Sequence, residues 1–139
     1  MFQPLYTAVA TAHGGREGEV RTDDGVVQHK LSMPTSVGGK GGPGTNPEQL
    51  FASGWSACFE SALRLVAAKQ KKPVKDAHIT ARITLGKGDD GGFQLAAELH
   101  GQIEGLSREE TQALMEAAHQ VCPYSKATRG NVPVTLIAD

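Results

Sequence analysis

The chain has 139 residues, enough for one domain with a hydrophobic core but too few for two domains of ordinary size. Its 14 Lys and Arg residues against 15 Asp and Glu residues give a net charge of −1, which removes the electrostatic basis for binding a nucleic acid or an anionic membrane. No apolar run approaches the ~20 residues of a membrane-spanning helix, and residues 1–10 lack the positive flank and the apolar run of a secretory signal. We therefore expect a single cytoplasmic domain over residues 1–139.

The first third of the chain predicts three strands. The alternation of side chains over residues 5–11 is typical of a strand, residues 19–22 are a second short extended piece, and residues 26–33 are a third. The second and third are joined by Asp23-Asp24-Gly25, which is a hairpin signal. A glycine-rich loop follows over residues 36–44.

A long helix is expected over residues 47–69. Thr45 or Asn46 can cap its start, and Glu48 lies near the positive end of its dipole. Residues 50–59 carry no charge, so this helix is apolar nearly all round. Such a helix is typically buried on every side, and we expect it to be the central element of the fold.

A hairpin of two strands is expected after this helix. Apolar residues alternate with polar ones over residues 79–85, and the sequence Asp89-Asp90-Gly91-Gly92 turns the chain. On the returning strand, the alternation predicts that one set of side chains faces the same core. This set consists of Phe93, Leu95, Ala97 and Leu99.

A second helix and a last strand complete the expected fold. Ser107 and Glu110 form a capping box at the start of this helix, which must end by Cys122 because Pro123 follows. Residues 132–137 read as the final strand. The expected order is β-β-β-α-β-β-α-β, which is an α+β domain.

Two cysteines, Cys58 and Cys122, are too few for a disulfide-rich secreted scaffold or for a metal site built on thiolates. The five histidines show no ligand spacing. A glycine pattern over residues 39–44 is interrupted by Pro43 and followed by Arg64, where a dinucleotide-binding motif needs an acidic residue. We expect no metal and no other cofactor, which leaves the cysteines as either two inert core residues or a redox couple.

Cys58 lies in the middle of the apolar helix, where burial would raise the pKa of its thiol and leave it unreactive. A reactive Cys58 therefore needs a cation from elsewhere in the chain. Arg16 can supply it, because the glycines around Arg16 allow the backbone to approach closely. A partly buried Arg16 would need a carboxylate in turn, and Glu48 at the start of the helix is available.

Three segments carry a resemblance to a known family, and the match covers essentially the whole chain. They are Thr11-Ala-His-Gly-Gly-Arg-Glu-Gly18, Thr45-Asn-Pro-Glu-Gln-Leu-Phe-Ala-Ser-Gly-Trp-Ser-Ala-Cys-Phe59 and Val121-Cys-Pro-Tyr-Ser-Lys-Ala-Thr-Arg-Gly-Asn131. These segments resemble the organic hydroperoxide resistance proteins of the OsmC/Ohr superfamily. The one unusual residue in them is Trp55, where a tyrosine would be unremarkable.

The resemblance implies an OsmC-like fold, an intertwined homodimer and a thiol-dependent peroxidase that acts on alkyl or fatty-acid hydroperoxides. It also implies roles for four residues: Cys58 as the peroxidatic thiol, Cys122 as the resolving thiol, and Arg16 with Glu48 as the activating pair. Recycling by a dithiol, such as a lipoylated protein, is the expected reductive step.

Helix geometry adds an expectation about the dimer. Ten residues of α-helix separate Glu48 from Cys58 by about 15 Å in rise and about 80° in facing, too far for an arginine side chain of ~7 Å to bridge. Two such helices packed antiparallel about a two-fold axis near Ser53 would bring residue 48 of one chain beside residue 58 of the other. We therefore expect Glu48 and Arg16 to serve Cys58 of the partner subunit.

Three other functions remain open from the sequence. The chain could be an OsmC-type peroxidase, which belongs to the same superfamily. It could be a non-enzymatic redox sensor, in which a disulfide between Cys58 and Cys122 switches a surface. It could also be a structural protein with two inert thiols.

Overall fold

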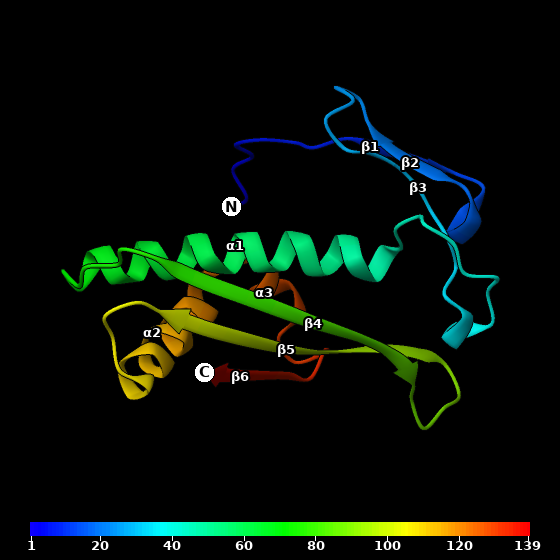
Figure 1. Ribbon diagram of the computed structural model, residues 1–139. Helices are drawn as coiled ribbons and strands as arrows, with labels where there is room; N and C mark the ends of the chain where they lie inside the picture. Colours follow the sequence, from blue (N-terminus) through cyan, green and yellow to red (C-terminus); the bar gives the residue numbers. More distant parts are fainter. The chain divides into compact units, whose positions relative to one another are not determined.

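The computed structural model describes residues 1–139, and the chain divides into two compact units, residues 1–50 and residues 51–139. Each unit contains one three-stranded sheet, and Figure 1 shows the elements of both. The expected order of strands and helices is confirmed, with one short helix added before the last strand. None of the helices combines the length and the hydropathy needed to cross a membrane.

The first unit contains an antiparallel sheet in the order β1-β2-β3. These strands are β1 (Ala10–His13), β2 (Glu19–Thr22) and β3 (Gln28–Lys30). The expected hairpin turn joins β2 to β3, and Gly25 adopts a φ of 73° in it. This conformation is readily available to glycine, which explains why the turn ends on that residue.

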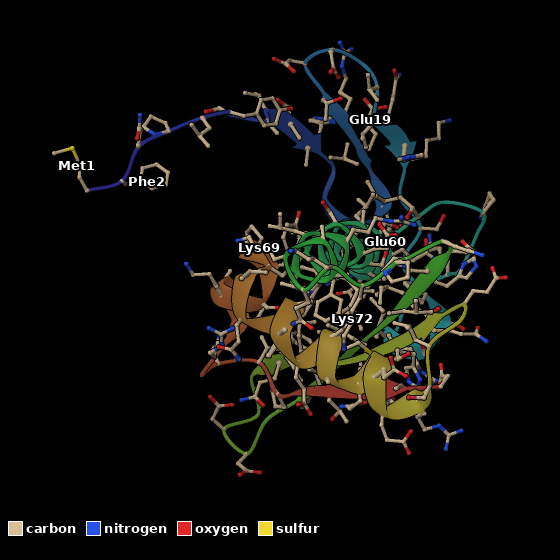
Figure 2. All side chains as sticks on the ribbon, turned by 90° about the vertical axis from the view of Figure 1, so that its left-hand side faces the viewer. Met1, Phe2, Glu19, Glu60, Lys69 and Lys72 are labelled. Carbon is tan, nitrogen blue, oxygen red and sulfur yellow. The ribbon has the colours of Figure 1, made fainter.

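The first strand begins at Ala10 rather than at residue 5, and the third is shorter than expected. Residues 1–9 form no strand although their side chains alternate, because no strand of the chain pairs with them. Phe2 is 89% exposed and Leu5 is 92% exposed. Figure 2 shows the side chains of Met1 and Phe2 on an extended N-terminal segment. An alternating pattern thus marks residues able to form a strand, while the strand itself needs a backbone partner.

The long helix α1 spans Pro47–Lys69, as expected. Asn46 is the cap, since its side-chain oxygen accepts a hydrogen bond of 2.8 Å from the backbone N–H of Gln49. One face of α1 is buried and holds Trp55, Phe59, Ala62, Leu63, Val66 and Ala67. Ser53 and Ala57, on another face of α1, are exposed. The expected burial of this helix on every side is therefore not seen within one chain.

The second unit contains a sheet in the order β4-β5-β6, formed by β4 (Ala77–Lys87), β5 (Phe93–Ile103) and β6 (Val134–Ala138). The strand β5 pairs antiparallel with β4 and parallel with β6. Ala97 and Leu99 on β5 are buried in the core, as expected, whereas Phe93 is 75% exposed. The expectation for Phe93 is wrong because this residue lies at the end of the strand, next to the hairpin turn and beyond the helices that cover the core.

Helix α2 spans Arg108–Val121, and its cap is the expected one: the Ser107 hydroxyl accepts a hydrogen bond of 3.1 Å from the N–H of Glu110. A short helix, α3 (Pro123–Thr128), follows at once and was not predicted. Proline ends α2 because it cannot continue a helix, but it also suits the first position of a new one. The buried residues of α1, α2, β5 and β6 form one hydrophobic cluster, and Cys122 belongs to it.

Candidate active site

The two cysteines lie side by side in the second unit. Cys58 is in the middle of α1, and Cys122 is the single residue between α2 and α3. Both are free thiols, and the Cys122 thiol donates a hydrogen bond to the Cys58 sulfur over 3.4 Å. A disulfide has a bond length of about 2.05 Å, so the sulfurs need to approach by roughly 1.4 Å to form one. The structure therefore brings together two residues that are 64 positions apart in the sequence.

The two thiols differ in their access to solvent. Cys122 is fully buried, whereas Cys58 is partly exposed. Burial raises the pKa of the Cys58 thiol, and the neighbouring Cys122 raises it further. A hydrogen bond from the backbone N–H of Tyr124 acts in the opposite direction and lowers this pKa. The net direction is upward, so the surroundings of Cys58 within this unit keep it protonated, as the sequence predicted.

Tyr124 is a site residue for which the sequence predicts no role. Its ring lies directly against α1: a Cβ atom added at Gly54 would lie 2.9 Å from the Tyr124 hydroxyl oxygen. The ring also packs edge-on against Phe51, with 6.1 Å between centroids, and Phe51 packs against Trp55 at 5.5 Å. The aromatic rings therefore hold Tyr124 against the helix that carries Cys58. The only signal for Tyr124 in the sequence was its place in the segment after Cys122.

Arg16 and Glu48 form a bidentate ion pair in the first unit. Nη1 of Arg16 donates to Oε2 of Glu48 over 2.8 Å, and Nη2 donates to Oε1 over 2.6 Å. The hydrogen bonds from Arg16 lower the pKa of the Glu48 carboxyl, and the carboxylate raises the pKa of the guanidinium. Both groups are therefore charged at neutral pH, and the guanidinium is fixed in orientation by its two parallel hydrogen bonds.

The glycines around Arg16 make its position possible. Arg16 lies in a single turn of 3-10 helix, residues 15–17, which is preceded by Gly14. Gly14 and Gly15 have φ values of 82° and 62°. A Cβ atom added at Gly18 would lie 1.8 Å from the carbonyl oxygen of His13, closer than two such atoms can approach. A side chain at position 18 would therefore open the turn that holds Arg16. The approach of this loop to Cys58 stays a prediction.

The structure joins the four predicted site residues as two pairs, one in each unit. The first pair can present a fixed positive charge, and the second can form a disulfide. No group of three or more His, Cys, Asp or Glu side chains is arranged to hold a metal ion. Action of Arg16 on Cys58 stays a prediction.

A family model, curated relatives and solved structures all place the chain among the same proteins. The sequence model of the family described as "OsmC-like protein" matches residues 38–137. The organic hydroperoxide resistance protein of Xanthomonas axonopodis pv. citri is 50% identical over 133 residues, which are 95% of this chain and 93% of that protein. The organic hydroperoxide resistance protein OhrA of Bacillus subtilis is 49% identical over 138 residues, or 98% of this chain and 97% of that protein. The crystal structure of an organic hydroperoxide resistance protein from Legionella pneumophila aligns with a TM-score of 0.92 at 50% identity and covers 99% of both chains.

Proposed function

We propose a function from the family to which the chain belongs, the organic hydroperoxide resistance proteins of the OsmC/Ohr family. The proposed function is that of a thiol-dependent peroxidase that reduces organic hydroperoxides to alcohols. The observation that carries the proposal is the 3.4 Å separation of the Cys58 and Cys122 sulfurs. One of these thiols is accessible and the other is fully buried. A partly exposed thiol beside a buried one suits a pair in which the first meets the substrate and the second resolves the product.

We propose that Arg16 activates Cys58. The pKa of the Cys58 thiol is raised by burial, so the nucleophilic thiolate needs a nearby positive charge. The guanidinium of Arg16 is held by both carboxylate oxygens of Glu48, which leaves its remaining N–H donors free to point elsewhere. Placed beside Cys58, it would stabilise the thiolate and then the alkoxide that leaves.

The reaction that we propose has two oxidative steps. The Cys58 thiolate attacks the peroxide oxygen that carries the proton, forming an S–O bond and breaking the O–O bond, and the departing alkoxide takes up a proton to give the alcohol. Cys58 is then a sulfenic acid. The Cys122 thiol attacks the Cys58 sulfur, an S–S bond forms, and water leaves. The peroxide gains two electrons and the two thiols lose them.

A dithiol would close the cycle by reducing the disulfide, and a lipoylated protein is the class of reductant that we propose. No metal or other cofactor is needed for any of these steps. The reducing conditions of the cytoplasm, where we propose that the protein acts, keep both cysteines as thiols between turnovers.

We propose that the active form is a homodimer in which Arg16 and Glu48 serve Cys58 of the partner subunit. Two observations on the single chain support a second copy as the partner. Ser53 and Ala57 leave an exposed face of small residues on α1 that another helix could approach closely. The first unit has Leu31 as its single buried apolar residue, so it lacks a core of its own.

Single-turnover oxidation tests the proposal. The reduced protein is mixed with one equivalent of cumene hydroperoxide or of hydrogen peroxide, and free thiols are counted over time. We expect rapid loss of two thiols per chain, faster with cumene hydroperoxide, and no rapid loss in Cys58→Ser. Sustained consumption of hydroperoxide with an excess of dithiol is also expected. Oxidation without turnover would instead indicate a redox sensor, and slow alkylation of Cys58 at neutral pH would indicate inert structural thiols.

A further inference from the structure

Most of the buried side-chain polar atoms without a hydrogen-bond partner belong to residues that lie close in sequence to a cysteine. The chain has four such side-chain atoms, and they belong to Trp55, His100, His119 and Ser125. Three of these residues stand three positions, or about one helical turn, from a cysteine: Trp55 before Cys58, His119 before Cys122, and Ser125 after Cys122. Unpaired buried polar groups are uncommon in folded proteins, so three of them within three positions of the two cysteines need an explanation.

Ser125 is the clearest of the three because it is fully buried, with an exposed fraction of 0%. Its hydroxyl has no partner, whereas the hydroxyl of Thr128 in the same helix donates to the carbonyl oxygens of Tyr124 and Ser125. Leaving a hydroxyl unpaired in the interior is costly. The missing partner of the Ser125 hydroxyl is explained if this hydroxyl donates a hydrogen bond to an acceptor that is present only in another state of the site.

Reduction of a disulfide between Cys58 and Cys122 would create such an acceptor. Cys122 has an exposed fraction of 0%, so a thiolate arriving from solvent can reach only the sulfur of Cys58. The attack forms a mixed disulfide on Cys58 and breaks the S–S bond, and Cys122 leaves as a thiolate. This negative charge appears at a fully buried atom, where an unpaired charge is strongly disfavoured.

We infer that the Ser125 hydroxyl is the hydrogen-bond donor that receives the Cys122 thiolate when the disulfide opens. Cys122 is the cap residue that immediately precedes α3, and Ser125 is the third residue of this helix, so the two residues lie three positions apart at the same helix start. The hydrogen bond stabilises the departing thiolate until it takes up a proton. The second thiol of the dithiol then attacks the mixed disulfide, releases Cys58 and leaves as a disulfide. This role rests on the disulfide cycle of the proposed function.

The test compares disulfide reduction with thiol oxidation in Ser125→Ala. The disulfide is closed with diamide, which needs no peroxidase activity, and is then reduced with dithiothreitol in stopped flow. Trp55, the only tryptophan, lies one turn from Cys58 and provides the fluorescence signal. We expect Ser125→Ala to slow reduction about tenfold, the size typical of a hydrogen bond to a charged group. Thr128→Val, which removes a buried hydroxyl that already has acceptors in the same helix, is the matched control and should reduce at the wild-type rate.

Two further measurements separate this role from a structural one. Loss of the Cys58 thiol to cumene hydroperoxide should be unchanged in Ser125→Ala, because Cys122 is not a leaving group in that step. The melting temperature of the reduced protein should be unchanged or higher, since an unpaired buried hydroxyl is removed. Reduction at the wild-type rate in Ser125→Ala would overturn the inference, as would equal slowing of reduction and oxidation. Slower disulfide reduction in His119→Asn but not in Ser125→Ala would assign the donor to His119 and would also overturn the inference.

Discussion

A mixed dimer tests whether the ion pair of one chain serves the thiol of the other. One chain carries Arg16→Ala and its partner carries Cys58→Ser. If Arg16 acts on Cys58 of the partner subunit, this dimer contains one site with both residues intact and one site with neither. If Arg16 acts within its own chain, each site lacks one of the two.

The expected size of the effect follows from the ion pair and from the length of α1. Loss of a preorganised donor that stabilises a developing oxyanion lowers the rate by roughly 10²–10³-fold, so each homodimeric variant should retain about 1% of the activity or less. In a continuous helix, residues 48 and 58 are about 15 Å apart along the axis, and Arg16 is bound to Glu48 at 2.6 and 2.8 Å. The purified mixed dimer should therefore show about half of the wild-type activity, from one intact site in two.

The assay uses two affinity tags to purify the mixed dimer and follows cumene hydroperoxide consumption with excess dithiol. A mixed dimer of Arg16→Ala and Glu48→Ala chains is the control. Because Arg16 and Glu48 pair within one chain, each site of this control lacks one member of the pair, and no activity should be regained above the mean of the parents. Activity near 1% in the first mixed dimer would refute transfer across the interface. Recovery of about half of the wild-type activity in the control would refute the pairing of Arg16 with Glu48 within one chain.

Three further predictions follow from the contacts. In Glu48→Gln, the free energy of unfolding should depend less on pH than in the wild type. The pKa of Glu48 in the folded protein lies below its usual 4.5, so the pair with Arg16 contributes about 1 kcal/mol of stability above pH 4.5 and loses it as the pH falls through the folded pKa. Urea unfolding of both proteins at pH 7 and at about pH 3 measures this difference. In Cys122→Ser, Cys58 should stop at the sulfenic acid after one equivalent of cumene hydroperoxide, so dimedone should label it in this variant and not in the wild type. Ser107→Ala should destabilise the protein by about 1 kcal/mol in urea unfolding, because the N–H of Glu110 loses its cap, whereas an unchanged midpoint would show that the cap contributes nothing.

Local signals predicted most of the secondary structure. Thr45 or Asn46 as a cap indicated the start of α1, where the structure uses Asn46, and Ser107 with Glu110 indicated the start of α2. These interactions involve residues within one turn of each other, so they can be recognised without knowing the rest of the fold. The same holds for the turn at Gly25, where positive φ favours glycine.

The errors arose where a local pattern needed a distant partner. Residues 5–9 alternate like a strand but pair with no strand of their chain, and Phe93 continues the apolar alternation of β5 beyond the part that the helices cover. The sequence also predicted a helix end at Pro123 but could not show that α3 begins there. A proline has both roles, and the packing of the following residues decides between them.

For the candidate site, the sequence alone determined which side chains carry reactive chemistry: two thiols, one guanidinium among glycines and one carboxylate at a helix start. The tertiary structure decided that Cys122 lies 3.4 Å from Cys58, that Tyr124 donates to the Cys58 sulfur, and that Ser125 is buried without a partner. The physical reason is that residue types and short spacings are local properties, whereas contact between residues 64 positions apart results from packing α1 against the segment between α2 and α3.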